Sequence, residues 1–261
     1  MKILSSKKIT DFIYLFAPVI SIGLLYIVWI KASSINPEFV PSPISAIERF
    51  WELVARPVSK ITITGHIWAS LSRVLIAVGL SSLIGITFGL FLGWNKTFYN
   101  LFSPVFEMLR PIPPIAWIPL VTLWFGIGEV PKIIIVFLAS FVAIVINTYT
   151  GVKMVDPFVI DVGRSFGVNG RHSLIEVIVP SALPAIFAGV KTSIGAGWMS
   201  VLAAEMISSR SGLGFLITRG MDSADIPLII VGMVLVGIVG AILSFSLTHL
   251  ERWMCPWKDS Q

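Results

Sequence analysis

The sequence is poor in charged residues. Asp, Glu, Lys and Arg make up only 13% of its 261 residues, whereas 56% are hydrophobic. Soluble domains carry about 25% charged residues, so a soluble globular domain is excluded. The mean hydropathy of +0.90 excludes an intrinsically disordered chain. Because a bilayer solvates apolar side chains on every face of a helix, the composition predicts an all-α, polytopic membrane protein.

Residues that build disulfides, metal sites and nucleotide sites are also scarce. Cys255 is the only cysteine, so no intramolecular disulfide can form, and the three histidines are too far apart in sequence for a helical metal site. No Gly-Lys dipeptide occurs, so the phosphate-binding loop Gly-x-x-x-x-Gly-Lys-Ser/Thr is absent. We expect no metal, no cofactor and no catalytic residue. The net charge of +5 is scattered without interleaved aromatics, so no nucleic-acid partner is expected.

Six long apolar runs predict six transmembrane helices. The runs are Phe12–Ile30, Ile67–Trp94, Phe102–Gly126, Lys132–Tyr149, Pro184–Met206 and Ile226–Leu250. Lysines at the N-terminus favour a cytoplasmic start, and six spans then leave both termini in the cytoplasm. The predicted organisation is a cytoplasmic segment 1–11, a first transmembrane helix 12–32, an extracytoplasmic connector 33–66 and a membrane core 67–261 with a cytoplasmic loop at 150–182.

Three local patterns refine this organisation. In the connector, apolar residues at helical spacing predict a short amphipathic helix over 44–54 that lies on the surface. Gly85, Gly89 and Gly93 recur every four residues, which allows two helices to approach closely in lipid; we favour packing within the bundle over a dimer seam. The Gly/Ser-rich segment Ser208–Asp225 is predicted to be a loop.

The third span contains several prolines and two charges. A segment with Pro111, Pro113 and Pro114 cannot continue as a straight helix, so a break is predicted around Arg110–Pro114. Ionisable and amphipathic groups at membrane depth are candidates for a solute pathway. The candidates are Glu107, Arg110, Trp117, Trp124, Asn147, Trp198 and Glu205. The alternatives are that Glu107 and Arg110 pair with each other and that the tryptophans are interfacial anchors.

The segment from Asp161 to Pro180 carries the most specific motif. Asp161-Val-Gly-Arg-Ser-Phe-Gly167, nine residues and Val177-Ile-Val-Pro180 resemble the permease signature of bacterial ABC importers, which runs Glu-Ala-Ala, three residues, Gly, nine residues, Ile-x-Leu-Pro. The spacing matches, whereas Asp161-Val-Gly163 replaces Glu-Ala-Ala and Val177-x-Val179 replaces Ile-x-Leu. The residues that carry the resemblance are Asp161, Gly163, Arg164, Ser165, Gly167, Val177 and Pro180. Gly167 allows a tight turn with positive φ, and Pro180 can open the next helix.

Further motifs resemble the branch of these permeases that imports taurine, aliphatic sulfonates and nitrate. They are Phe39-Val-Pro-Ser-Pro43, His66-Ile-Trp-Ala-Ser-Leu-Ser-Arg-Val-Leu75, Arg110-Pro-Ile-Pro-Pro-Ile-Ala-Trp-Ile-Pro119, Leu123-Trp-Phe-Gly-Ile-Gly-Glu129, Gly197-Trp-Met-Ser-Val-Leu-Ala-Ala-Glu205 and Ser211-Gly-Leu-Gly-Phe215. The proline-rich run and the closing Cys255-Pro-Trp-Lys258 are most similar to taurine permeases.

The resemblance implies a type I ABC importer permease in the bacterial inner membrane. It also implies the partners: a second copy of the chain, two ATPase subunits that bind ATP-Mg, a solute-binding protein and membrane lipid. The implied solute is taurine or an alkanesulfonate, with nitrate, bicarbonate or another small solute as alternatives. An ion-gradient-driven carrier is the alternative mechanism. Such a carrier would have discontinuous helices in matching halves, whereas only one Pro-broken span is visible.

Overall fold

The computed structural model describes the backbone of residues 2–254 and the side chains of residue 17 and of 19–251. The described part contains helices and no strand. The elements are α1 (Lys2–Ile35), α2 (Pro43–Ala55), η1 (Val58–Lys60), α3 (Ile63–Trp94), α4 (Lys96–Leu109), η2 (Pro114–Trp117), α5 (Ile118–Phe125), α6 (Glu129–Lys153), α7 (Pro157–Ser165), η3 (Ser173–Ile178), α8 (Val179–Ser208), α9 (Leu213–Asp222) and α10 (Ile226–Met254). The side chains of the N-terminal lysines and the Cys255–Lys258 motif lie outside the described residues.

Long apolar helices account for most of the predicted spans. Within the described residues, α3, α6, the continuous helix formed by η3 and α8, and α10 are each long and apolar enough to cross a membrane. The third predicted span is α4 followed by η2 and α5, which meet at an angle of 86°, so the predicted break is confirmed. The first predicted span lies in α1, whose described apolar part is Val19–Ile35; this first span therefore stays a prediction.

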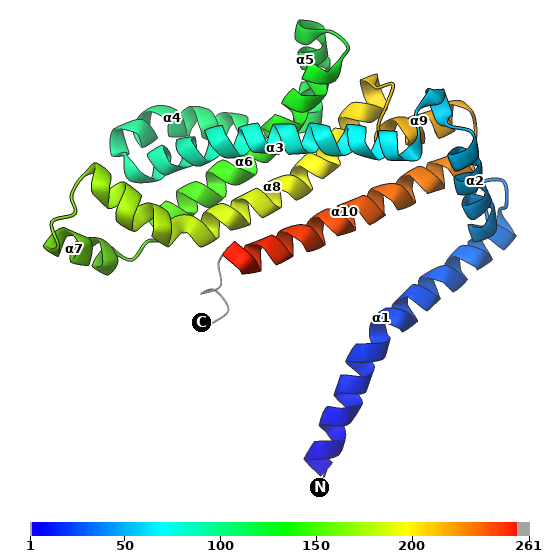
Figure 1. The fold of residues 1–261 in the computed structure, drawn as a ribbon, viewed down its shortest axis with the longest axis horizontal. Helices are drawn as coiled ribbons and strands as arrows, with labels where there is room; N and C mark the ends of the chain where they lie inside the picture. The colour runs from blue at the N-terminus through cyan, green and yellow to red at the C-terminus, as the bar shows by residue number, and fades with distance from the viewer. Residues whose placement is uncertain (1, 255–261) are drawn as a thin grey trace.

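The long helices run side by side, and the shorter elements gather at the two ends of this bundle (Figure 1). At one end lies α7, which joins α6 to α8. At the opposite end lie α2 and α9. Helix α1 diverges from the bundle, and α5 projects from its side. The segments predicted as a cytoplasmic loop and as extracytoplasmic connectors therefore lie at opposite ends of the molecule.

The three glycines spaced by four residues lie where α3 crosses α6. A Cβ atom on Gly89 would come within 2.7 Å of the Thr148 side chain, and one on Gly93 within 2.6 Å of Val152. Gly85 faces Ile144 one turn away, at 3.1 Å. In lipid, helices associate through close van der Waals packing, which small residues permit. The predicted packing of these glycines within the bundle is confirmed.

Two elements differ from the sequence-based expectations. The segment predicted as a Gly/Ser-rich loop contains α9, which exists because Leu213 and Leu216 are buried against the bundle, at 0% and 1% exposure. The fifth span begins at Ser173 and not at Pro184. Pro180 does occupy the first turn of α8, but a π-helical segment precedes it directly. Proline has no N–H for the α-helical ladder and clashes with the carbonyl four residues earlier, and the residue four before Pro180 lies in the π-helical segment.

The amphipathic helix predicted in the connector is α2. Its N-terminus is capped by the Ser42 hydroxyl, which accepts a hydrogen bond from Ser45 N at 3.1 Å. Ala46 and Leu53 are buried, and Leu53 belongs to the main core with residues of α10. The predicted apolar face is largely exposed, with Ile44 at 66% and Trp51 at 63%, as suits a helix that contacts lipid.

Candidate functional site

The break in the third span lies beside a salt bridge. Helix α4 ends at Leu109, and the prolines that follow deprive the next turn of backbone donors. Arg110 Nη1 lies 2.9 Å from Glu107 Oε1 one helical turn earlier, and the two side chains are 45% and 56% exposed. The predicted pairing of these residues is confirmed.

A cavity of about 140 Å³ opens next to this pair. It lies between α3, α4 and α6 and includes Glu107 and Arg110 in its lining. Tyr99 of α4 and Tyr149 of α6 form part of its wall, with ring centroids 5.6 Å apart. The cavity is therefore lined by charged, aromatic and hydroxyl groups together.

Three other pathway candidates do not line this cavity. Trp117 is partly buried and packs against the core cluster that contains Ile118. Trp124 is 63% exposed on α5. Asn147 faces Gly189 of α8 and donates from Nδ2 to the Ala143 carbonyl at 2.8 Å. Among the described residues, these side chains are not brought together with Arg110.

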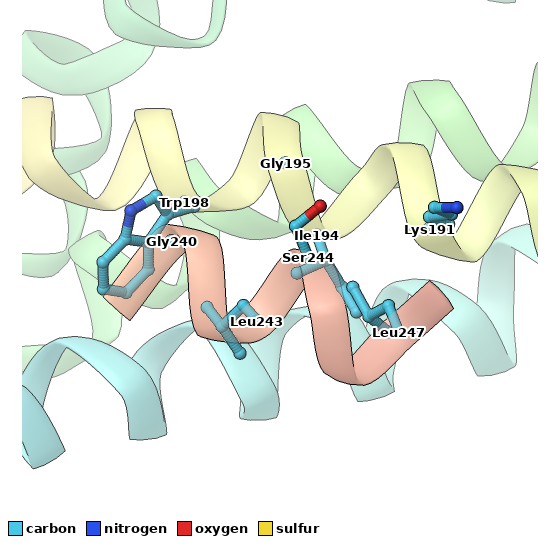
Figure 2. A pocket seen from close by; sticks show the side chains of 8 residues that line it. All are labelled: Lys191, Ile194, Gly195, Trp198, Gly240, Leu243, Ser244 and Leu247. Atoms are coloured by element: carbon cyan, nitrogen blue, oxygen red, sulfur yellow. The ribbon is translucent and has the colours of Figure 1, made fainter. Parts of the chain in front are cut away.

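Trp198 lies in a separate groove between α8 and α10, shown in Figure 2. The groove has a volume of about 90 Å³. Trp198 is buried against Gly240, and its indole N–H has no hydrogen-bond partner in the described structure. Lys191, at the other end of the groove, forms an ion pair with Glu251 at 2.9 Å. The groove is lined mainly by apolar and small residues.

A buried ion-pair network contains the last candidate, Glu205. Arg73 of α3 lies between Glu205 of α8 and Glu129 at the start of α6; its side chain is 3% exposed and that of Glu205 is 0% exposed. Arg73 Nη2 donates to Glu129 Oε1 at 2.8 Å, and Lys132 Nζ lies 3.0 Å from the same oxygen. Since an unpaired buried charge is strongly destabilising, these contacts hold α3, the start of α6 and the end of α8 together.

The turn before α9 is bound into the same network. Gly214 N donates to Glu205 Oε2 at 2.9 Å, and Ser70 Oγ donates to the same oxygen at 2.9 Å. Gly212 N donates to His66 Nδ1 at 3.1 Å. Gly212 has a φ of +116° and a Cβ there would collide with the Glu205 carboxylate. The network thus requires glycine at this position.

The predicted role of Glu205 on an open pathway does not fit this burial. Its carboxylate is enclosed and fully used by hydrogen bonds, so its visible role is to join α8 to α3 and α9. Arg73 was not among the predicted site residues. The signal that identifies it is an arginine inside a long apolar run, since such a group needs a partner within the membrane.

The segment from Asp161 to Pro180 begins in the last turns of helix α7. The C-terminus of α7 is closed by two hydrogen bonds, from Gly167 N to the Arg164 carbonyl at 2.9 Å and from Val168 N to the Gly163 carbonyl at 3.0 Å. Together with the φ of +84° at Gly167, these bonds define a Schellman motif. The predicted tight turn at Gly167 is confirmed.

Two motif residues contact each other across the turn. A Cβ on Gly163 would lie 3.0 Å from Val177 Cγ2, so the glycine that replaces alanine in the motif lets η3 pack closely on α7. Arg164 pairs with Asp161 at 3.1 Å on the exposed side, and Ser165 Oγ donates to the Asp161 carbonyl. The motif residues therefore maintain a compact helix–turn–helix.

The outer edge of α7 is apolar and exposed. Phe158 of α7 is 71% exposed, and Phe166, which directly follows α7, is 82% exposed. Helix α7 lies at the end of the bundle remote from α2 and α9 (Figure 1). Exposed aromatics on a short, rigid element suit docking into a pocket of another protein.

No group of three metal-ligating side chains occurs among the described residues.

Comparison with known proteins gives one family. The family of binding-protein-dependent transport system inner membrane components matches residues 81–258. The taurine transport system permease protein TauC of Escherichia coli is 33% identical over 241 residues, which cover 91% of this chain and 88% of that protein. The nitrate import permease protein NrtB of Synechocystis is 31% identical over 258 residues, covering 96% and 94%.

A solved structure shows the same fold. An inward-facing crystal form of the MetNI methionine ABC transporter superposes with a TM-score of 0.61 at 19% sequence identity, covering 78% of this chain and 97% of that chain. The architecture is thus that of a type I ABC importer permease. The chain belongs to the family of binding-protein-dependent transport system inner membrane components, within the branch of the taurine, nitrate and aliphatic sulfonate permeases.

Proposed function

We propose that this chain is the membrane-spanning subunit of an ATP-driven importer for a small anion, with taurine or an alkanesulfonate as the solute. The observation that carries the proposal is α7, a short helix with an exposed apolar edge that is held at one end of the bundle by the Schellman turn at Gly167. An ATPase partner needs such a rigid contact to transmit movement to the membrane helices. Because this chain has no phosphate-binding loop, the partner supplies the ATP-Mg site.

The two ends of the bundle have different proposed partners. The ATPase contacts the α7 end, which is then cytoplasmic, as are the chain termini. A solute-binding protein contacts the opposite end, at the connector of residues 33–66 and the segment around α9. Two copies of the chain pair within the membrane, because each of the two ATPase subunits needs one α7 to bind.

The solute assignment rests on the relatives. Taurine, nitrate and aliphatic sulfonates are the solutes named for permeases that align over most of this chain. Arg110 supports an anion route, since its guanidinium can hold a sulfonate through two parallel hydrogen bonds. The break in the third span places Arg110 at the edge of a cavity.

The test is ATP hydrolysis by the reconstituted complex. The chain is combined with its ATPase and binding protein in lipid discs, and hydrolysis is measured with the binding protein empty or loaded with taurine, an alkanesulfonate or nitrate. The expected result is stimulation by a loaded binding protein and its loss in Gly167→Trp, which destroys the turn. Normal assembly and stimulation in Gly167→Trp would refute the role of α7.

A further inference from the structure

The cavity beside the helix break has an unusual combination of charges. Glu107 and Arg110 lie on one wall, supplied by α4 and the residue after it. Lys153 of α6 lies outside the cavity lining but close to its two tyrosines, with its Nζ 5.9 Å from the ring centroid of Tyr99 and 6.0 Å from that of Tyr149. A solute in this cavity meets one carboxylate and one guanidinium.

The charged pair can open at little cost. Glu107 and Arg110 are about half exposed, and exposed ion pairs contribute only about 0–1 kcal/mol to stability. The planar guanidinium of Arg110 donates one hydrogen bond to Glu107, and it can instead hold a sulfonate through two parallel hydrogen bonds. Such an exchange leaves Glu107 free to accept hydrogen bonds from an ammonium group on the same solute.

The remaining walls suit a short chain between two charged ends. Ser103 and Thr150 supply hydroxyl groups, and Leu92, Phe106 and Val145 supply apolar surface. One water needs about 10–15 Å³ of cavity volume, so the volume of about 140 Å³ has room for a solute of several heavy atoms. The two tyrosine rings, stacked with an interplanar angle of 15°, form a rigid side.

We infer that this cavity is a transient binding site for zwitterionic solutes, and that it prefers an amino-alkanesulfonate to an anion of the same size without the amine. Arg110 binds the sulfonate, and Glu107 binds the ammonium. The inference rests on the proposed function and names a substrate class for it, namely solutes that carry both a sulfonate and an ammonium group. A cavity that recognised only anions would have no use for a carboxylate next to its arginine.

The test compares two probes of nearly equal size. Binding of taurine and of 2-hydroxyethanesulfonate to the permease–ATPase complex in lipid discs is measured by saturation-transfer NMR, without the binding protein, so that its selectivity does not enter. The expected preference for taurine is about fivefold, the size of one exposed charge contact. Glu107→Gln removes the preference, Glu107→Asp retains it, and Arg110→Gln weakens binding of both probes.

Controls separate the alternatives. Asn100→Ala, on the exposed side of α4 and outside the cavity lining, is expected to change neither affinity. Equal affinities in the unmodified complex, or a preference that persists in Glu107→Gln, would overturn the inference. Uptake of either solute by the full complex is measured in parallel. Absence of all ATP-dependent uptake would instead refute the proposed function.

A lipid headgroup that carries both an amine and a phosphate has the same chemistry. The binding measurements are therefore made in discs of phosphatidylglycerol alone and in discs that also contain phosphatidylethanolamine. Equal taurine affinity in both supports a solute site. Competitive loss of taurine binding with phosphatidylethanolamine would assign the cavity to a lipid and overturn the inference.

Discussion

Arg73 of α3 and Glu205 of α8 form a direct ion pair in which neither side chain exposes more than 3% of its surface. Glu205 also accepts a hydrogen bond from Gly214 N in the turn before α9. The pair therefore connects two membrane helices and the turn that precedes α9. Arg73, Glu205 and Gly214 come from three of the sequence motifs that resemble the permease branch.

Replacing Arg73 by glutamine is expected to destabilise the protein strongly. The change leaves Glu205 buried without its cation, and breaking a buried pair costs about 3–5 kcal/mol. The apparent melting temperature in lipid discs measures the effect. Arg164→Gln is the control, because its pair with Asp161 is exposed and contributes about 0–1 kcal/mol. If Arg73→Gln and Arg164→Gln have the same melting temperature, the network does not stabilise the fold.

Removing both charges tests whether the pair acts as a unit. The double variant Arg73→Met with Glu205→Gln leaves no unpaired charge at this position. We expect it to lose less stability than the sum of the single variants Arg73→Met and Glu205→Gln, with a coupling of about 0.5–3 kcal/mol. Strictly additive losses would contradict a direct interaction.

Gly212→Ala is expected to disturb the turn before α9. The residue has a φ of +116°, a conformation that costs non-glycine residues about 1–3 kcal/mol, and the new methyl group meets the Glu205 carboxylate. The matched control is Gly237→Ala in α10, where a Cβ meets no atom within 4 Å. Only Gly212→Ala should lower the melting temperature, and equal behaviour of the two would count against the constraint.

Gly89→Ala is expected to push α3 away from α6. The added Cβ would lie 2.7 Å from Thr148 Cβ, and overpacking of this kind costs about 1–3 kcal/mol. Gly79→Ala in the same helix has open space and should be neutral or stabilising by about 0.5–1 kcal/mol. Thermal unfolding in lipid discs compares the two. A melting temperature that falls in Gly79→Ala and not in Gly89→Ala would contradict the predicted close packing of α3 on α6 at Gly89.

Phe166→Ser is expected to weaken the ATPase contact without unfolding the chain. The ring is 82% exposed, so its loss changes little of the core. Co-purification of the ATPase with the tagged permease should fall at least tenfold if Phe166 is an interface anchor, which corresponds to about 1.4 kcal/mol or more. An unchanged yield of complex, with an unchanged melting temperature, would place the contact elsewhere.

The membrane helices could be predicted from the sequence because their signal is local. The apolar composition of a run such as Ile67–Trp94 is enough to indicate a membrane-spanning helix. The prolines after Arg110 exclude a straight helix in any tertiary environment. The four-residue spacing of Gly85, Gly89 and Gly93 likewise predicted close packing, which the structure places at α6. The tight turn at Gly167 could also be predicted locally, because glycine has no Cβ and adopts positive φ without strain.

The buried network could not be predicted in the same way. Arg73, Glu129 and Glu205 come from separate motifs, and only the packing of α3, α6 and α8 brings their side chains together. Helix α9 was missed because Gly212 and Gly214 suggest a loop, whereas burial of Leu213 and Leu216 supplies the stabilisation that local propensity lacks. Tertiary contacts routinely override propensity in short helices.

The most direct test of the proposed mechanism is solute uptake into vesicles that contain the chain, its ATPase and its binding protein. With ATP available to the ATPase, the proposal predicts uptake of the solute from the loaded binding protein, unchanged when ionophores collapse the proton and sodium gradients. Uptake that proceeds without ATP or ATPase, driven by an imposed ion gradient, would contradict it and identify the chain as a secondary carrier.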